Sequence, residues 1–107
     1  MASLPSLFIS HGSPELAVRT TAAHTFLTTY GRELPRPRAI LVASAHWETA
    51  SPMVATGAHP ATIYDFGRFD PRLREIRYAA PGAPEVGARA AELVGAAGFT
   101  VSADPTH

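Results

Sequence analysis

The apolar residues of this chain fall into short runs that are separated by proline and glycine. The run PSLFIS at residues 5–10 ends at the turn-forming sequence His-Gly-Ser-Pro, and residues 39–45 read AILVASA, which is apolar almost without a break. Short apolar runs bounded by turns are typical of strands that are buried on both faces of a parallel sheet. We therefore predict strands at residues 5–10 and 39–45.

A helix is predicted between these two strands. Ser13 suits an N-cap, and Pro14 suits the first helical position because its fixed φ matches the helix and its missing N–H has no partner there. Gly31 is a plausible stop. Apolar residues recur at near-helical spacing in between, at Leu16, Ala23, Phe26, Leu27 and Tyr30. A strand, helix and strand joined in this way form a βαβ unit, which makes the two strands parallel.

The second half of the chain continues the alternation. We expect a strand at residues 52–56, an irregular loop over 57–71, a short helix over 71–78, a helix over 85–97 and the start of a strand at 99–102, because proline and glycine divide the sequence at these points. The chain is thus predicted to be an α/β protein, with a parallel βαβ core in a three-layer arrangement.

The amino-acid composition excludes several classes of protein. The 107 residues fit one domain or part of one, with 46% hydrophobic residues and a balance of nine basic and nine acidic side chains. There is no basic stripe for nucleic acid, no apolar run of the roughly 18 residues that span a membrane, and no signal peptide. A cytoplasmic protein with a small-molecule substrate is the simplest expectation. Cysteine is absent, so a metal site would use histidine and carboxylate ligands.

Two histidines follow the predicted strands. His11 comes directly after residues 5–10 and His46 after residues 39–45. Ligand sites in parallel sheets form at the carboxyl ends of the strands, so adjacent strands would bring both imidazoles to one metal. The alternative is that each histidine is only a hydrogen-bonded turn residue. Glu48 could complete a set of two histidines and one carboxylate, although a carboxylate that is solvated or that orients an imidazole is the more common case.

Other polar residues are weaker candidates. Arg68 in the loop could bind an anionic substrate, and Asp65 could add a carboxylate. His24 and His59 are expected to be exposed residues that bind no metal. No glycine pattern of a nucleophile elbow surrounds any serine, so serine hydrolysis is not favoured.

Four segments together resemble the class III extradiol ring-cleavage dioxygenases, specifically the 4,5-DOPA-dioxygenase-like branch. They are LFISHGSP from Leu7, LPRPRAILVASAHWE from Leu34, TIYDFGRF from Thr62 and IRYAAPGAPE from Ile76. The resemblance implies a non-haem metal enzyme with catalytic Fe²⁺, often found with Zn²⁺, that opens a catechol ring and inserts both atoms of O₂. It matches the family's metal histidines to His11 and His46, and we predict that Trp47, Tyr64, Asp65 and Arg68 bind the substrate.

The chain also departs from the family pattern. Family members are more than twice as long, and their remaining metal ligands and acid/base histidine are expected downstream of His107, which itself precedes that motif. Tyr64 stands where some relatives carry histidine. We therefore expect residues 1–107 to be the N-terminal part of one catalytic domain, inactive alone and able to self-associate through exposed sheet edges. A zinc hydrolase on the same scaffold and a non-enzymatic metal-binding fragment are the alternatives.

Overall fold

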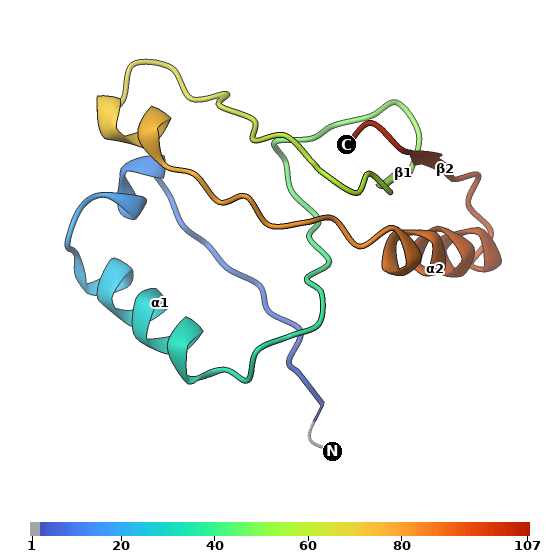
Figure 1. Cartoon of the computed structure of the whole chain (residues 1–107), viewed down its shortest axis with the longest axis horizontal. Helices are drawn as coiled ribbons and strands as arrows, with labels where there is room; N and C mark the ends of the chain where they lie inside the picture. The colour runs from blue at the N-terminus through green and yellow to red at the C-terminus, as the bar shows by residue number, and fades with distance from the viewer. Residues whose placement is uncertain (1–2) are drawn as a thin grey trace. The chain divides into compact units, whose positions relative to one another are not determined.

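The computed structural model describes residues 3–107 and divides into two compact units. The first unit comprises Met1–Arg38 and Tyr64–Ile76, and the second comprises Ala39–Ile63 and Arg77–His107. Each unit is therefore built from two separate stretches of the sequence. Figure 1 traces the chain through both.

Short helices make up the first unit. A 3₁₀ helix, η1 (Pro14–Ala17), precedes the α-helix α1 (Ala22–Glu33), and a second 3₁₀ helix, η2 (Pro71–Glu75), packs against η1. Leu73 of η2, with 3% of its surface exposed, is the one buried hydrophobic residue in the described part of the chain. Little apolar surface is thus covered in this unit.

The boundaries of α1 differ from the prediction. Ser13 accepts a hydrogen bond from the backbone N–H of Glu15, but it caps only η1, and Thr21 provides a second N-cap from which α1 starts. The helix continues through Gly31, so the stop predicted there is wrong. It ends before Leu34, which is extended (φ −69°, ψ 142°) because Pro35 disfavours a helical conformation in the residue that precedes it.

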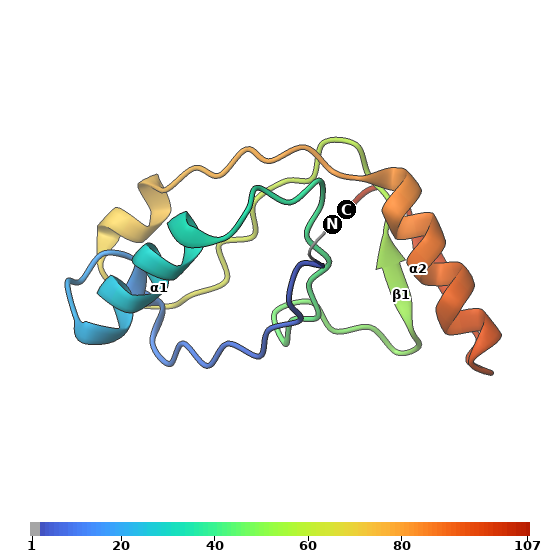
Figure 2. The same cartoon turned by 90° about the horizontal axis from the view of Figure 1, so that it is seen from below.

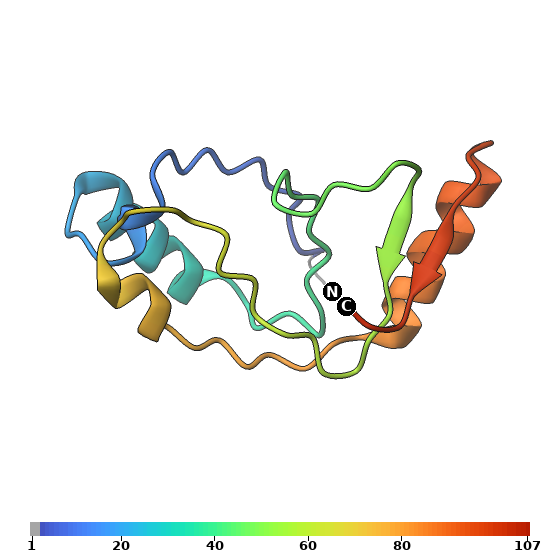
Figure 3. The same ribbon diagram turned by 90° about the horizontal axis from the view of Figure 1, so that it is seen from above.

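A parallel βαβ unit forms the second unit of the chain. Strands β1 (Met53–Ala55) and β2 (Ser102–Asp104) pair in parallel, with Val54 opposite Ala103, and the arrows point the same way in Figure 3. Helix α2 (Pro84–Ala96) contacts both strands and runs alongside β1 in Figure 2. The predicted helix at 85–97 and the predicted strand at 52–56 are confirmed, and β2 lies close to the strand start predicted at 99–102.

Gly87 explains how closely α2 approaches β1. It is buried, and a Cβ atom at this position would lie 2.5 Å from the carbonyl oxygen of Ala55 and 3.1 Å from Cγ2 of Thr56. Only glycine fits at such a distance from the backbone. Gly98, with φ +100°, follows the end of α2 in the left-handed conformation that commonly terminates helices.

The two strands predicted at residues 5–10 and 39–45 are not strands here. In the described residues, the only ladder joins β1 to β2. Phe8 is 98% exposed and Val42 is 71% exposed, so these apolar runs are extended but uncovered. A strand is stable only when a neighbour pairs with its backbone N–H and C=O groups, and apolar sequence alone does not supply that neighbour. The βαβ unit predicted from these two runs is therefore not observed among the described residues, and the βαβ unit that forms instead joins β1, α2 and β2.

The remaining predictions concern the length of the helix at residues 71–78, the layers of the fold and the absence of a membrane-spanning segment. The helix predicted at residues 71–78 is the shorter 3₁₀ helix η2. The observed sheet has two strands and is compatible with an α/β fold. Among residues 3–107, none of the helices has both the length and the apolar character needed to cross a membrane.

Candidate metal and substrate site

His11 lies in a tight turn of the first unit. Gly12 has φ +63°, the left-handed region that favours glycine, and it turns the chain away from residues 5–10. Nδ1 of the exposed His11 ring lies 3.1 Å from the carbonyl oxygen of Gly12. When Nδ1 carries the proton and donates to this oxygen, the lone pair is on Nε2, which is then the ring atom suited to bind a metal.

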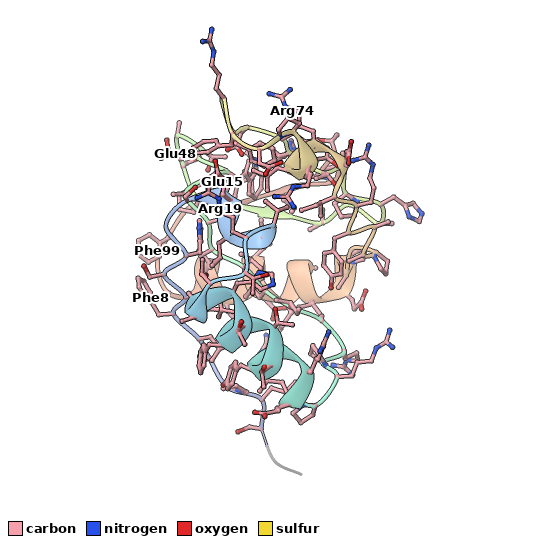
Figure 4. All side chains as sticks on the ribbon, turned by 90° about the vertical axis from the view of Figure 1, so that its left-hand side faces the viewer. Phe8, Glu15, Arg19, Glu48, Arg74 and Phe99 are labelled. Carbon is pink, nitrogen blue, oxygen red and sulfur yellow. The ribbon has the colours of Figure 1, made fainter. Side chains whose placement is uncertain are left out.

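A hollow of about 230 Å³ adjoins His11 within the same unit. Glu15 and Arg19 form an ion pair across one turn, with 2.8 Å between the Glu15 carboxylate and Nε of Arg19, and both side chains are labelled in Figure 4. The sequence prediction did not include this pair, although its i, i+4 spacing could have indicated it. The residues that line the hollow are His11, Ser13, Glu15, Leu16, Arg19 and Thr21.

His46 and Trp47 lie in a turn of the second unit. The backbone N–H of His46 donates to Oγ of Ser44 at 3.2 Å, and that of Trp47 donates to the Ser44 carbonyl oxygen at 3.4 Å. His46 is exposed and Trp47 is half-buried. Glu48, the candidate third ligand, is exposed. Between residue 3 and His46 the structure has no strand, so the turn and its hydrogen bonds to Ser44 position the histidine, and the predicted strand end does not.

The carboxyl end of β2 carries a cluster that the sequence prediction missed. Oδ1 of Asp104 accepts hydrogen bonds from the backbone N–H of Thr106 at 2.8 Å and from its hydroxyl, and Oδ2 lies 2.7 Å from Nδ1 of His107. The Thr106 hydrogen bonds, followed by that of His107, lower the pKa of Asp104 to about 2. The Asp-Pro-Thr sequence was the available signal, because aspartate often accepts a bond from the backbone two residues on.

Trp47 lies against this cluster. Its ring centroid is 5.2 Å from that of His107, and the two planes are inclined by 30°. His107 could not be assigned a role from the sequence. The structure thus brings a predicted substrate residue into contact with one that was left unassigned.

The other predicted substrate residues belong to the first unit. The Tyr64 hydroxyl donates to the carbonyl oxygen of Ile76 at 2.7 Å, and the Tyr64 ring meets Phe66 edge-on with centroids 6.0 Å apart. Tyr64 is half-buried, whereas Asp65 and Arg68 are exposed. Tyr64 is therefore held by specific contacts.

Asp70, two residues after Arg68, stabilises the start of η2. Its carboxylate caps η2 by accepting from the backbone N–H of Arg72, and it also accepts from the guanidinium, with 2.6 Å between Oδ2 and the nearest guanidinium nitrogen. These hydrogen bonds lower the pKa of Asp70 to about 2. The pair fixes the start of η2, the helix that carries the buried Leu73.

The donor chemistry of the predicted ligands fits a transition metal only in part. Imidazole nitrogen is a common ligand of iron and zinc, so His11 and His46 are suitable donors. They belong to different units of the chain. Within residues 3–107 no three or more His, Asp or Glu side chains gather into a group that could hold a metal ion. The two histidines could therefore supply two ligands, and a complete coordination sphere would require others.

Comparison with known proteins identifies the family. Residues 5–106 match the family described as the catalytic LigB subunit of aromatic ring-opening dioxygenase. The chain is 41% identical over 97 residues to the 4,5-DOPA dioxygenase extradiol of Portulaca grandiflora, covering 88% of this chain and 36% of the relative. The protein of that name from Escherichia coli K12 is 41% identical over 91 residues, which cover 85% of this chain and 34% of the relative.

A more distant relative gives the same result. Dioxygenase tasH of Hapsidospora irregularis is 33% identical over 117 aligned positions, with 98% of this chain and 36% of the relative covered. The chain thus spans about a third of the length of the curated relatives that it matches. The resemblance inferred from the four sequence segments is confirmed, and because the match covers nearly all of its residues, the chain belongs to the aromatic ring-opening dioxygenase family of the catalytic LigB subunit.

Proposed function

We propose that this chain is the N-terminal part of a non-haem, metal-dependent extradiol dioxygenase that opens the ring of a catechol-type, DOPA-like substrate and inserts both atoms of O₂. The observation that carries the proposal is the family match over residues 5–106, which includes both candidate ligands. The relatives named 4,5-DOPA dioxygenase extradiol support the substrate class.

His11 and His46 are the proposed metal ligands, with Fe²⁺ as the catalytic metal and Zn²⁺ as an alternative occupant. A bound metal would supply the Lewis acidity and redox chemistry that reaction of a catechol with O₂ requires. The contact between His11 and Gly12 would set the ring tautomer for ligation. In the second unit, the bonds to Ser44 would limit the positions that His46 can take.

Four side chains are proposed to contact the substrate. Trp47 would form an aromatic wall beside His46, since the two are adjacent in one turn. Tyr64 and Arg68 would contribute a hydroxyl and a cation for the polar groups of a DOPA-like molecule, and Asp65 would contribute a carboxylate. The acid/base histidine and the remaining ligands would come from sequence beyond these 107 residues.

The uncovered apolar runs support a larger sheet. Residues 5–10 and 39–45 have the pattern of buried strands, yet Phe8 and Val42 are strongly exposed. We propose that these runs pair in the complete domain and form the three-layer α/β arrangement expected from the sequence. The 107-residue chain alone would then be inactive.

Oxygen consumption tests the function. The complete gene product that contains this chain, loaded anaerobically with Fe²⁺, is expected to consume O₂ when L-DOPA is added and to form a yellow ring-opened product. The zinc-loaded protein and resorcinol, whose hydroxyls are not adjacent, are the controls. Failure to consume O₂ across a panel of catechols would refute the proposal, and product formation without O₂ would favour a hydrolase.

A further inference from the structure

The carboxyl edge of the β1–β2 pair holds a hydrogen-bonded cluster of Asp104, Thr106 and His107, none of which is among the predicted metal ligands or substrate contacts. Asp104 ends β2, and its carboxylate accepts from Nδ1 of His107 at 2.7 Å. The Asp104 side chain is only 18% exposed, while that of His107 is 47% exposed. The carboxylate thus holds one edge of an imidazole that remains accessible at the edge where parallel sheets place their functional groups.

Backbone bonds fix this cluster to the sheet. The N–H of Thr56 donates to the Asp104 carbonyl oxygen at 2.8 Å, and the N–H of Gly57 donates to the His107 carbonyl oxygen at 2.6 Å. A Cβ atom on Gly57 would lie only 2.4 Å from that oxygen, so a glycine is required for the close approach. The position of the His107 backbone is therefore set by the segment that directly follows β1.

The imidazole is in turn placed against Trp47. The two ring centroids are 5.2 Å apart with an inclination of 30°, within the range in which aromatic rings attract one another. Trp47 directly follows His46, and both are bonded through their backbone to Ser44. All of these residues belong to the second unit.

We infer that His107, held by Asp104, is a positioning residue that fixes Trp47 and, through it, the turn that carries His46. The link to metal binding rests on the proposed function, since it needs His46 to be a ligand. The positioning of Trp47 does not depend on a metal.

Fluorescence tests the positioning directly, because Trp47 is the only tryptophan in the chain. Quenching of its emission by acrylamide is measured for the 107-residue chain and for His107→Ala. Removal of the imidazole should expose Trp47 and raise the quenching constant about twofold, since the ring face that it covers becomes open. His59→Ala, a change at an exposed histidine of the same unit, should leave the constant unchanged.

Two further variants separate the ring from the hydrogen bond. His107→Phe keeps an aromatic ring and should remain closer to the parent chain than His107→Gln, which keeps only a polar side chain. Far-UV circular dichroism, which reports the helix content of the whole chain, shows whether each variant is folded. Equal quenching in the parent chain, His107→Ala and His107→Gln would overturn the inference.

Zinc affinity tests whether His107 also positions His46. It distinguishes this role from direct binding of the metal by His107. In the complete gene product, His107→Ala should weaken Zn²⁺ binding about tenfold, as loss of a group that orients a ligand does. His107→Phe should restore most of the affinity if His107 acts through Trp47, whereas a loss as large as that of His107→Ala would show that His107 is a ligand and would overturn the positioning role. If His46→Ala leaves Zn²⁺ affinity unchanged, the proposed ligand role fails, and the fluorescence result still decides whether His107 positions Trp47.

Discussion

The two units of the chain differ in how their helices and strands are joined. In the second unit, β1, α2 and β2 supply one another with backbone bonds and packing, and Gly87 brings helix and strand together. In the first unit, α1 has no buried residue, and Leu73 of η2 is the only buried hydrophobic side chain described. The second unit thus joins its elements by a strand ladder and a close helix approach, whereas the first joins only short helices. Apolar side chains stay uncovered in both units, as Phe8 in the first and Val42 in the second show, so both need further contacts.

The largest effect is expected from filling the space at Gly87. In Gly87→Val the new side chain would collide with the carbonyl of Ala55, so α2 must move and the second unit should lose about 3 kcal/mol of unfolding free energy. Urea denaturation followed by circular dichroism measures the loss.

Gly95→Ala is the matched control for this change. Its Cβ atom would make an ordinary contact with Val101 at 3.7 Å, so the gain in helix propensity should stabilise α2 by up to about 1 kcal/mol. Similar losses in both variants would show that helix approach to β1 is not what holds the second unit together.

Leu73→Ala should destabilise the first unit by about 2 kcal/mol, because it removes the one buried hydrophobic side chain there. Thermal or urea unfolding followed by far-UV circular dichroism gives the loss of unfolding free energy. Phe8→Ala is the control, since a side chain that is 98% exposed should change stability by less than about 0.5 kcal/mol. A larger effect at Phe8 than at Leu73 would mean that residues 5–10 are packed and would reverse the comparison.

Acid should loosen the edge of the second unit through Asp104. Its pKa is lowered from 3.8 to about 2 by bonds from Thr106 and His107, so folding favours the ionised carboxylate. The resulting stabilisation is fully present above pH 4 and is lost as the pH falls through 2. Trp47 fluorescence should therefore change between pH 4 and 2, and Asp104→Asn should remove that change.

Asp70 provides the control for this titration. Its pKa is also lowered to about 2, by Arg72, but it belongs to the first unit. Asp70→Asn should leave the Trp47 profile unaltered. An altered profile would show that the titration is not specific to Asp104.

The smallest effect is expected on the surface of α2. Arg89 and Glu92 form an ion pair at 2.9 Å, but their side chains are 62% and 69% exposed, so solvent screens the attraction. Glu92→Gln should cost no more than about 0.3 kcal/mol in a urea titration. A loss comparable to that of Gly87→Val would show that the pair belongs to a network.

The sequence predicted elements best where local signals and partners coincide. Pro84 and Gly98 bracket α2, and its boundaries were predicted to within one residue. Residues 5–10 and 39–45 have equally clear apolar patterns, but strand formation depends on a neighbouring strand, which a local pattern cannot reveal. The helix end at Leu34 depended on Pro35, a signal that was outweighed by the glycine at position 31.

Some residues of the candidate site could be predicted from the sequence, and others could not. His11 and His46 were found from their place after apolar runs, and their role as ligands stays a prediction. The contact between Trp47 and His107 joins positions 60 residues apart, and no spacing rule identifies such a pair. Asp104 was missed although its partners are only two and three residues further on, because the turn signal of Asp-Pro-Thr was not considered.

Metal content tests the central claim most directly. The complete gene product that contains this chain is purified, loaded with Fe²⁺ or Zn²⁺, desalted and analysed for bound metal per protein molecule. The proposal predicts one metal ion in the parent protein and almost none in His11→Ala and in His46→Ala, with His59→Ala unchanged as the exposed-histidine control. Full metal occupancy in either of the first two variants would show that the residue replaced is not a ligand and would contradict the account.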